Sequence, residues 1–263
     1  MVRQLWRQRD LILGLTRREV AARYKGSMLG SVWAGLLPLA MLLVYTFVFT
    51  VVFDARLNVG AGDAPRGAYA VFLFSGLAVY AVISEVVNRS PGLLLENVAY
   101  IKKVAFPVEI MPVVSVLAAL FNAALSFVIL GVVYVAVLGA PPWSALAVPL
   151  YVAAAGLIAL GLGWAFAGLG VYLRDIRQLV GVATTALMFL SPVFYPLAQV
   201  PAAFRPAMHV NPLTPLLEGM RAALFEGTVP LAGLAGVLAF SILVAIGGRW
   251  LFGRLREGFA DVV

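Results

Sequence analysis

The sequence predicts an all-α polytopic membrane protein with six membrane-spanning helices and both ends in the cytoplasm. Composition is the first observation: 63% of the 263 residues are hydrophobic and only 12% are charged, whereas a soluble globular domain carries roughly 25% charged residues. The mean hydropathy of +1.00 agrees with this. The other two observations are a series of apolar runs long enough to cross a bilayer and an uneven distribution of Lys and Arg among the loops.

The N-terminal segment, residues 1–31, precedes the first apolar run and is strongly basic. Its arginines alternate with apolar side chains, which a purely solvated tail would not need. This pattern is typical of an amphipathic helix that lies along the inner headgroups. The apolar residues concerned are Leu5, Trp6, Leu11, Ile12, Leu15 and Val20.

Six apolar runs follow, and each is long enough to cross the membrane as a helix. The third and fourth exceed one hydrocarbon thickness, so we expect them to tilt or to project from the bilayer. Pro192 and Pro196 are expected to end the fifth helix early. The predicted spans are residues 32–53, 69–87, 108–138, 145–173, 178–195 and 231–252.

The positive charges give the orientation. Seven Lys and Arg precede the first span, three lie in the second loop, two in the fourth and three at the C-terminal end, against four in the alternate loops. Positive residues concentrate on the cytoplasmic side, so both ends are predicted to be inside. The formal charge of +7 is therefore attributed to contact with membrane lipids rather than with nucleic acid.

The external stretch 196–230 is too polar and too rich in proline to span the membrane. Its second half nevertheless carries an apolar helical face, which predicts short re-entrant helices that dip into the outer leaflet. The alternative is an ordinary external loop. The residues of this face are Leu213, Leu216, Leu217, Met220, Leu224 and Phe225.

Several classes of chemistry are missing from the sequence. There is no G-x-x-x-x-G-K-[ST] phosphate loop, no cysteine and only one histidine, His209. The centres of the spans carry no Asp, Glu, Lys or Arg, which argues against an ion-coupled carrier and against an intramembrane hydrolase. The sequence therefore predicts no catalytic, cofactor-binding or metal site, and any ATP that drives this protein would bind another chain.

Aromatic residues are the commonest remaining candidates for handling a substrate. One stripe recurs every four residues in the first span, and a second group lies at the outer end of the fifth. Such rings can stack on the C–H faces of sugars, but helix packing or an interfacial belt explains them as well. The residues are Tyr45, Phe49, Phe53, Phe189, Phe194 and Tyr195.

Two further patterns predict packing. Glu85 and Arg89 are four residues apart in the second span, and we expect them to pair across one helical turn. The fourth span carries small residues at four-residue spacing, which favours close helix packing. These small residues are Ala155, Ala159, Gly163 and Ala167.

Five stretches resemble, in order, the membrane subunit of ABC-2 type exporters of bacterial surface polysaccharides, especially O-antigen. They cover most of the chain, and the resemblance identifies residues 1–263 as a single transmembrane domain of that family. The stretches are RREVAARYKGSMLGSVWAGLLPL from Arg17, ENVAYIKKVAFPVEIMP from Glu96, LRDIRQ from Leu173, SPVFYPLAQVP from Ser191 and NPLTPLLEGMRAALFEG from Asn211.

The resemblance implies a homodimer that binds two copies of a separate ATPase, which holds ATP and Mg, and a lipid-linked polysaccharide as substrate in the bacterial inner membrane. It places a coupling loop at residues 88–107 and an external gate at 196–230, and it implies a channel lined mainly by the first and fifth spans. The implied ATPase-coupling residues are Glu96, Asn97, Tyr100, Ile101, Lys102, Lys103, Arg174, Asp175 and Arg177. The implied gate residues are Ser191, Pro192, Pro196, Asn211, Pro212, Glu218 and Arg221.

Other readings stay open on sequence alone. Capsule, teichoic acid, drug and lipid exporters of the same type share much of the pattern. A membrane-embedded glycan or lipid transferase is a distant alternative, and it would require an acid–base cluster that the sequence does not suggest.

Overall fold

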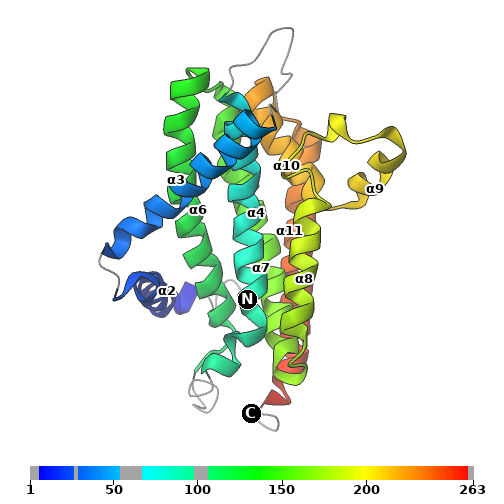
Figure 1. Cartoon of the computed structure of the whole chain (residues 1–263). Helices are drawn as coiled ribbons and strands as arrows, with labels where there is room; N and C mark the ends of the chain where they lie inside the picture. The colour runs from blue at the N-terminus through cyan, green and yellow to red at the C-terminus, as the bar shows by residue number, and fades with distance from the viewer. Residues whose placement is uncertain (1–5, 27–28, 54–66, 98–105, 260–263) are drawn as a thin grey trace.

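The structure, a computed structural model, describes residues 6–26, 29–53, 67–97 and 106–259, and these residues form helices and no strand. Long helices stand side by side, one helix crosses them near the inner end, and short helices form a lobe at the outer end (Figure 1). The helices are α2 (Arg9–Tyr24), α3 (Trp33–Thr46), α4 (Ala68–Leu93), α6 (Ile110–Leu138), α7 (Val148–Tyr172), α8 (Ile176–Phe189), α9 (Arg205–Val210), α10 (Leu213–Arg221) and α11 (Leu231–Arg256). The π-helical turns η2 (Phe47–Val52) and η7 (Ala222–Glu226) continue α3 and α10.

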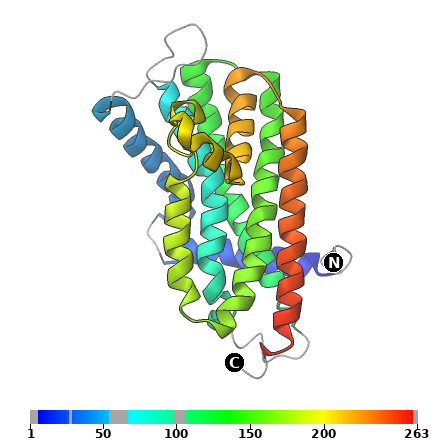
Figure 2. The ribbon, with the colours of Figure 1, turned by 90° about the vertical axis from the view of Figure 1, so that its right-hand side faces the viewer.

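The prediction of an all-α membrane protein is confirmed. Five helices are long and apolar enough to cross a membrane: α3 with η2, α4, α6, α7 and α11. The fifth predicted span is the shorter apolar helix α8, whose 14 residues reach about 21 Å. The 29 residues of α6 reach about 43 Å, longer than a hydrocarbon core of about 30 Å. In Figure 2 the dark blue helix α2 and the red end of α11 both lie in the lower half of the molecule.

Helix α4 forms the centre of the bundle because α6, α7 and α8 pack around it. In its most apolar stretch 78% of the residues are buried, against 6% for α3 and η2. The small-residue prediction for α7 is confirmed, since Ala155, Ala159 and Ala167 are completely buried. The small side chains allow α7 to approach its neighbours closely. Among the five candidate spans of the described residues, the one formed by α3 and η2 is the least buried.

Helices α7 and α11 approach each other most closely at two glycines. A Cβ atom on Gly248 would lie 1.9 Å from the carbonyl oxygen of Gly161, and one on Gly161 would lie 2.3 Å from that of Val244. No larger side chain fits at either position without separating the helices.

The external segment folds back onto the bundle. Its predicted apolar face exists, but it packs on protein rather than on lipid: Leu216, Leu217 and Met220 are at most 1% exposed, and α10 contacts α4, α7 and α11. As predicted, α8 ends before the prolines, at Phe189. The polypeptide thus reaches the outer side as a short helix followed by a non-helical turn that α10 covers.

Candidate functional site

The two predicted aromatic groups come together at the outer end of the molecule. The ring of Phe49 on η2 stacks on that of Phe194, with centroids 6.0 Å apart and planes at 13°. Phe194 in turn stacks on Phe189 at 5.4 Å, and Phe53 lies 5.7 Å from Phe49. The sequence suggested both groups but not their contact, because nothing in the sequence aligns the first span with the fifth.

Rings outside the two predicted aromatic groups extend this group inward. Tyr69 stacks on Phe49 at 5.9 Å and lies 6.0 Å from Phe72, which lies 5.9 Å from Phe225. We call the whole set the outer aromatic cluster: Phe49, Phe53, Tyr69, Phe72, Phe189, Phe194 and Phe225.

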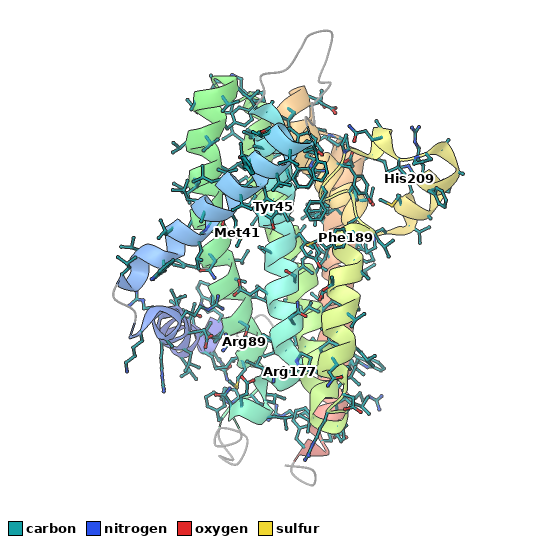
Figure 3. All side chains as sticks on the ribbon, viewed as in Figure 1. Met41, Tyr45, Arg89, Arg177, Phe189 and His209 are labelled. Atoms are coloured by element: carbon teal, nitrogen blue, oxygen red, sulfur yellow. The ribbon has the colours of Figure 1, made fainter. Side chains whose placement is uncertain are left out.

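One end of the outer aromatic cluster is open. Phe53 is 66% and Phe189 59% exposed, whereas Tyr69 and Phe72 are each 5% exposed. The cluster therefore presents ring faces at the surface of the subunit and anchors them on buried rings of α4. The other two predicted residues are peripheral: Tyr45 is half-buried against the α4 rings, and the Tyr195 hydroxyl donates to the carbonyl of Phe189 at 2.7 Å. Figure 3 shows Tyr45 and Phe189 near α4 in the outer half.

The backbone that carries Phe49 is itself unusual. Residues Phe47–Val52 form a π-helical turn directly after α3. π-Helical turns are rare and occur frequently at functional sites. The wider turn changes the direction of side chains relative to a regular helix, so a four-residue stripe in the sequence does not remain a straight stripe in space.

Arg221 holds the turn that follows α8. Its guanidinium donates to the carbonyl oxygens of Pro192 and, at 2.6 Å, of Val193, and it lies 3.6 Å from the centroid of Phe72. Backbone carbonyls outside a helix at membrane depth need such partners because no water reaches them. The buried Arg221 therefore joins α10, the turn and the outer aromatic cluster.

The ionisation of Arg221 and of its neighbour Glu218 follows from the burial of their side chains. Burial lowers the pKa of Arg221 to about 10, so the side chain stays charged at neutral pH. The Glu218 carboxylate lies 3.6 Å away, and burial raises the pKa of Glu218 above that of an ordinary carboxyl although the charge of Arg221 opposes this shift.

Other predicted gate residues meet at the same turn. The Asn211 side-chain amide donates to the Ser191 hydroxyl at 2.8 Å and to the carbonyl of Leu190 at 3.0 Å. Its amide oxygen accepts from the Leu213 backbone N–H at 3.0 Å. Pro212 directly precedes α10 and Pro196 begins the stretch that leads to α9. Ser191, Asn211 and Arg221 thus fix the turn from two sides.

At the inner end the structure joins the two predicted coupling loops. Glu96 and Arg177 form an ion pair at 3.5 Å, while Arg174 and Asp175 are exposed at the α7–α8 turn. The Asn97 side chain donates to the carbonyl of Leu93 at 2.9 Å. The remaining predicted coupling residues lie outside the described residues; they are Tyr100, Ile101, Lys102 and Lys103.

The predicted pair between Glu85 and Arg89 is wrong. Glu85 pairs with Arg23 and Arg89 pairs with Glu19, because α2 packs beside α6 and its long side chains reach α4, offering partners that a single helix cannot reveal. In Figure 3 Arg89 and Arg177 lie in the inner half. The two ion pairs tie the interface helix to the central helix.

Sequence reasoning also missed a buried carboxylate just after the coupling loop. Glu109 is 2% exposed and lies 3.0 Å from Arg256 and 3.8 Å from Arg249 on α11. Its backbone carbonyl accepts from the indole N–H of Trp164 at 2.9 Å. The available signal in the sequence was a single acidic residue at the start of an apolar run, together with a basic C-terminal end that could pair with it.

Comparisons with known proteins cover the whole chain. The family model described as ABC-2 type transporter matches residues 10–225. The chain is 30% identical to the O-antigen export system permease protein RfbA of Myxococcus xanthus, over 100% of this chain and 99% of that protein. It is 24% identical to the RfbA of Klebsiella pneumoniae, over 97% and 95%, and 24% identical to the polysialic acid transport protein KpsM of Escherichia coli, over 95% of each.

Proposed function

Because this chain belongs to the ABC-2 type transporter family, we propose that it exports a lipid-linked bacterial surface polysaccharide of the O-antigen kind. The chain is a multi-pass protein of the inner membrane and a transport subunit, as the resemblance implied. Support for the substrate comes from relatives named for O-antigen export that align over nearly their whole length.

The observation that carries the proposal is the outer aromatic cluster. Its open rings, Phe53 and Phe189, offer flat apolar faces and no fixed charge. Such faces bind the C–H surfaces of sugars weakly, so a polymer can slide past them. A site built to hold one small substrate would instead need several converging polar groups.

We propose that two copies of the chain form the passage. The span formed by α3 and η2 leads directly to the exposed Phe53 and has only 6% of its apolar stretch buried, so a second subunit can cover it and close a channel. Closed two-fold symmetry is the commonest way for identical subunits to complete such a wall.

ATP hydrolysis is assigned to two copies of a separate ATPase that hold ATP and Mg, since this sequence has no phosphate-binding loop. The ATPase would dock at Glu96, Asn97, Arg174, Asp175 and Arg177. The ion pair between Glu96 and Arg177 joins the two loops that carry these residues. The proposal extends to Tyr100, Ile101, Lys102 and Lys103 in the same loop. Closure of the ATPases would then tilt the spans through the inner loops.

A second candidate is the export of a different surface glycan, which is favoured by the relative named as a polysialic acid transport protein. Teichoic acid, drug or lipid export would use the same subunit arrangement. A membrane-embedded transferase is the distant alternative, and it predicts activity without any ATPase partner.

Gentle purification of the tagged chain from its native membranes tests the proposal. We expect an ATPase to co-purify in stoichiometric amount and ATP hydrolysis to be sensitive to vanadate. Deletion of the gene should retain the glycan inside the cell, and the parent chain should restore export. A chain that purifies alone, and whose deletion leaves the surface glycan unchanged, would overturn the proposal.

A further inference from the structure

A groove between α2, α3 and α6 is separate from the outer aromatic cluster and lies at the opposite end of the molecule. Its volume is about 960 Å³, near the upper end of the range for ligand-binding cavities. Its rim is cationic and its floor is apolar. The lining includes Arg17, Arg18 and Lys25 at the rim and Ala34, Phe121 and Leu125 on the floor.

The three cations are available for a ligand. The neighbouring charges on α2 are used internally, because Glu19 pairs with Arg89 and Arg23 pairs with Glu85. No ion pair between Arg17, Arg18 or Lys25 and another described residue is present, and all three are exposed. The groove therefore carries a local excess of positive charge that the protein does not neutralise there.

The depth of the floor fixes the kind of molecule that fits. Ile12 of α2 packs on Ile110 and Val114, and Leu117 lies against the same cluster, so α2 is level with the first two turns of α6. Phe121 and Leu125 are one and two turns further along, about 6 and 12 Å deeper in the membrane. Phe121 is 46% exposed, so its ring is accessible to an acyl chain.

We propose that this groove binds one anionic phospholipid of the inner leaflet, with its phosphate between the rim cations and an acyl chain on Phe121 and Leu125. A soluble partner cannot fill an apolar floor above the interface helix. A neutral lipid would leave the rim charges without a counter-charge. The bound lipid would hold α2 against α3 and α6, independently of which substrate the protein exports.

Native mass spectrometry of the full purified chain tests this by measuring the Kd of the first phosphatidylglycerol and of the first phosphatidylcholine bound. Each basic residue near a membrane surface contributes about fivefold in affinity for anionic lipid. Replacing both arginines, Arg17→Gln with Arg18→Gln, should therefore weaken phosphatidylglycerol binding about 25-fold. Phosphatidylcholine binding should change little.

Arg7→Gln with Arg9→Gln is the matched control, because it removes the same charge from the same basic segment but outside the groove. A second variant, Leu125→Trp, fills the floor without changing the charge, and it should weaken binding of both lipids. Equal losses in the groove and control variants would overturn the proposal. A parent chain that binds phosphatidylglycerol and phosphatidylcholine equally well would also overturn it. The same holds for a Leu125→Trp chain that no longer dimerises but still binds its lipid.

Discussion

Replacing Arg221 by lysine should open the turn after α8 while keeping the positive charge. Lysine carries a single ammonium group and cannot reproduce the planar fork that reaches the carbonyls of Pro192 and Val193. One buried carbonyl left without a donor costs about 1–3 kcal/mol, and loss of the guanidinium from the face of Phe72 costs about 0.5–2 kcal/mol. We expect a loss of about 3 kcal/mol in the free energy of unfolding.

That loss corresponds to a fall of roughly 6–12 °C in Tm for a chain of this length, measured by thermal unfolding in detergent. Arg205→Lys is the matched control, because Arg205 also donates to two backbone carbonyls, those of Val200 and Ala198, each at 2.8 Å. Arg205 is exposed, so its variant should lower Tm by less than about 2 °C. Equal effects at the two positions, or no effect at Arg221, would refute the reasoning from burial.

Three other predictions concern the ion pairs, the helix contact and the pH dependence. Glu19→Arg and Arg89→Glu should each lower Tm by themselves, and the double variant should recover most of the loss, as a double-mutant cycle would measure. Gly248→Ala should cost about 3 kcal/mol because its Cβ would overlap a backbone carbonyl of α7, whereas Gly247→Ala meets no atom within 4 Å and should leave Tm unchanged. The raised pKa of Glu218 means that the folded protein binds this proton more tightly than the unfolded chain. The contribution of Glu218 to stability is therefore complete at pH values below its pKa in the unfolded chain, and it is lost as the pH rises through its pKa in the folded protein. Glu218→Gln should remove this part of the dependence of Tm on pH.

Hydropathy was sufficient to predict where the apolar helices lie along the chain, although the fifth predicted span is the short helix α8 and only the other five are long enough to count as candidate spans among the described residues. A bilayer excludes unpaired backbone groups and charges, so these features depend on local sequence alone. The small-residue stripe of α7 was predictable for the same reason, since close packing at Ala155, Ala159 and Ala167 requires small side chains whatever the neighbour is.

Contacts between segments far apart in the sequence were not predictable. The partner of Glu85 is Arg23 because α2 returns to pack on α6 beside α4, and helical spacing contains no information about that return. The contact between Phe49 and Phe194 likewise depends on the turn after α8. The turn needs Arg221 as a donor, and the visible sign of it was a cation set among the apolar residues Leu217, Met220 and Leu224.

The two ends of the subunit differ in chemistry. Ring faces and a turn fixed by Arg221 occupy the outer end, while ion pairs and the basic groove occupy the inner end. Glu109, held by Arg249 and Arg256, links the start of α6 to α11 next to the predicted coupling loop. A force applied at the inner loops can therefore reach α11 as well as α4.

Site-specific photo-crosslinking during export tests the central claim most directly. A benzophenone side chain would replace Phe53 or Phe189, which present the open rings, or Ile246, which is 56% exposed on α11 away from the outer aromatic cluster. The account predicts that polysaccharide becomes attached at positions 53 and 189 in the presence of ATP, and not at 246. Attachment at 246 alone, or at none of the three positions while export continues, would contradict a path along the outer aromatic cluster.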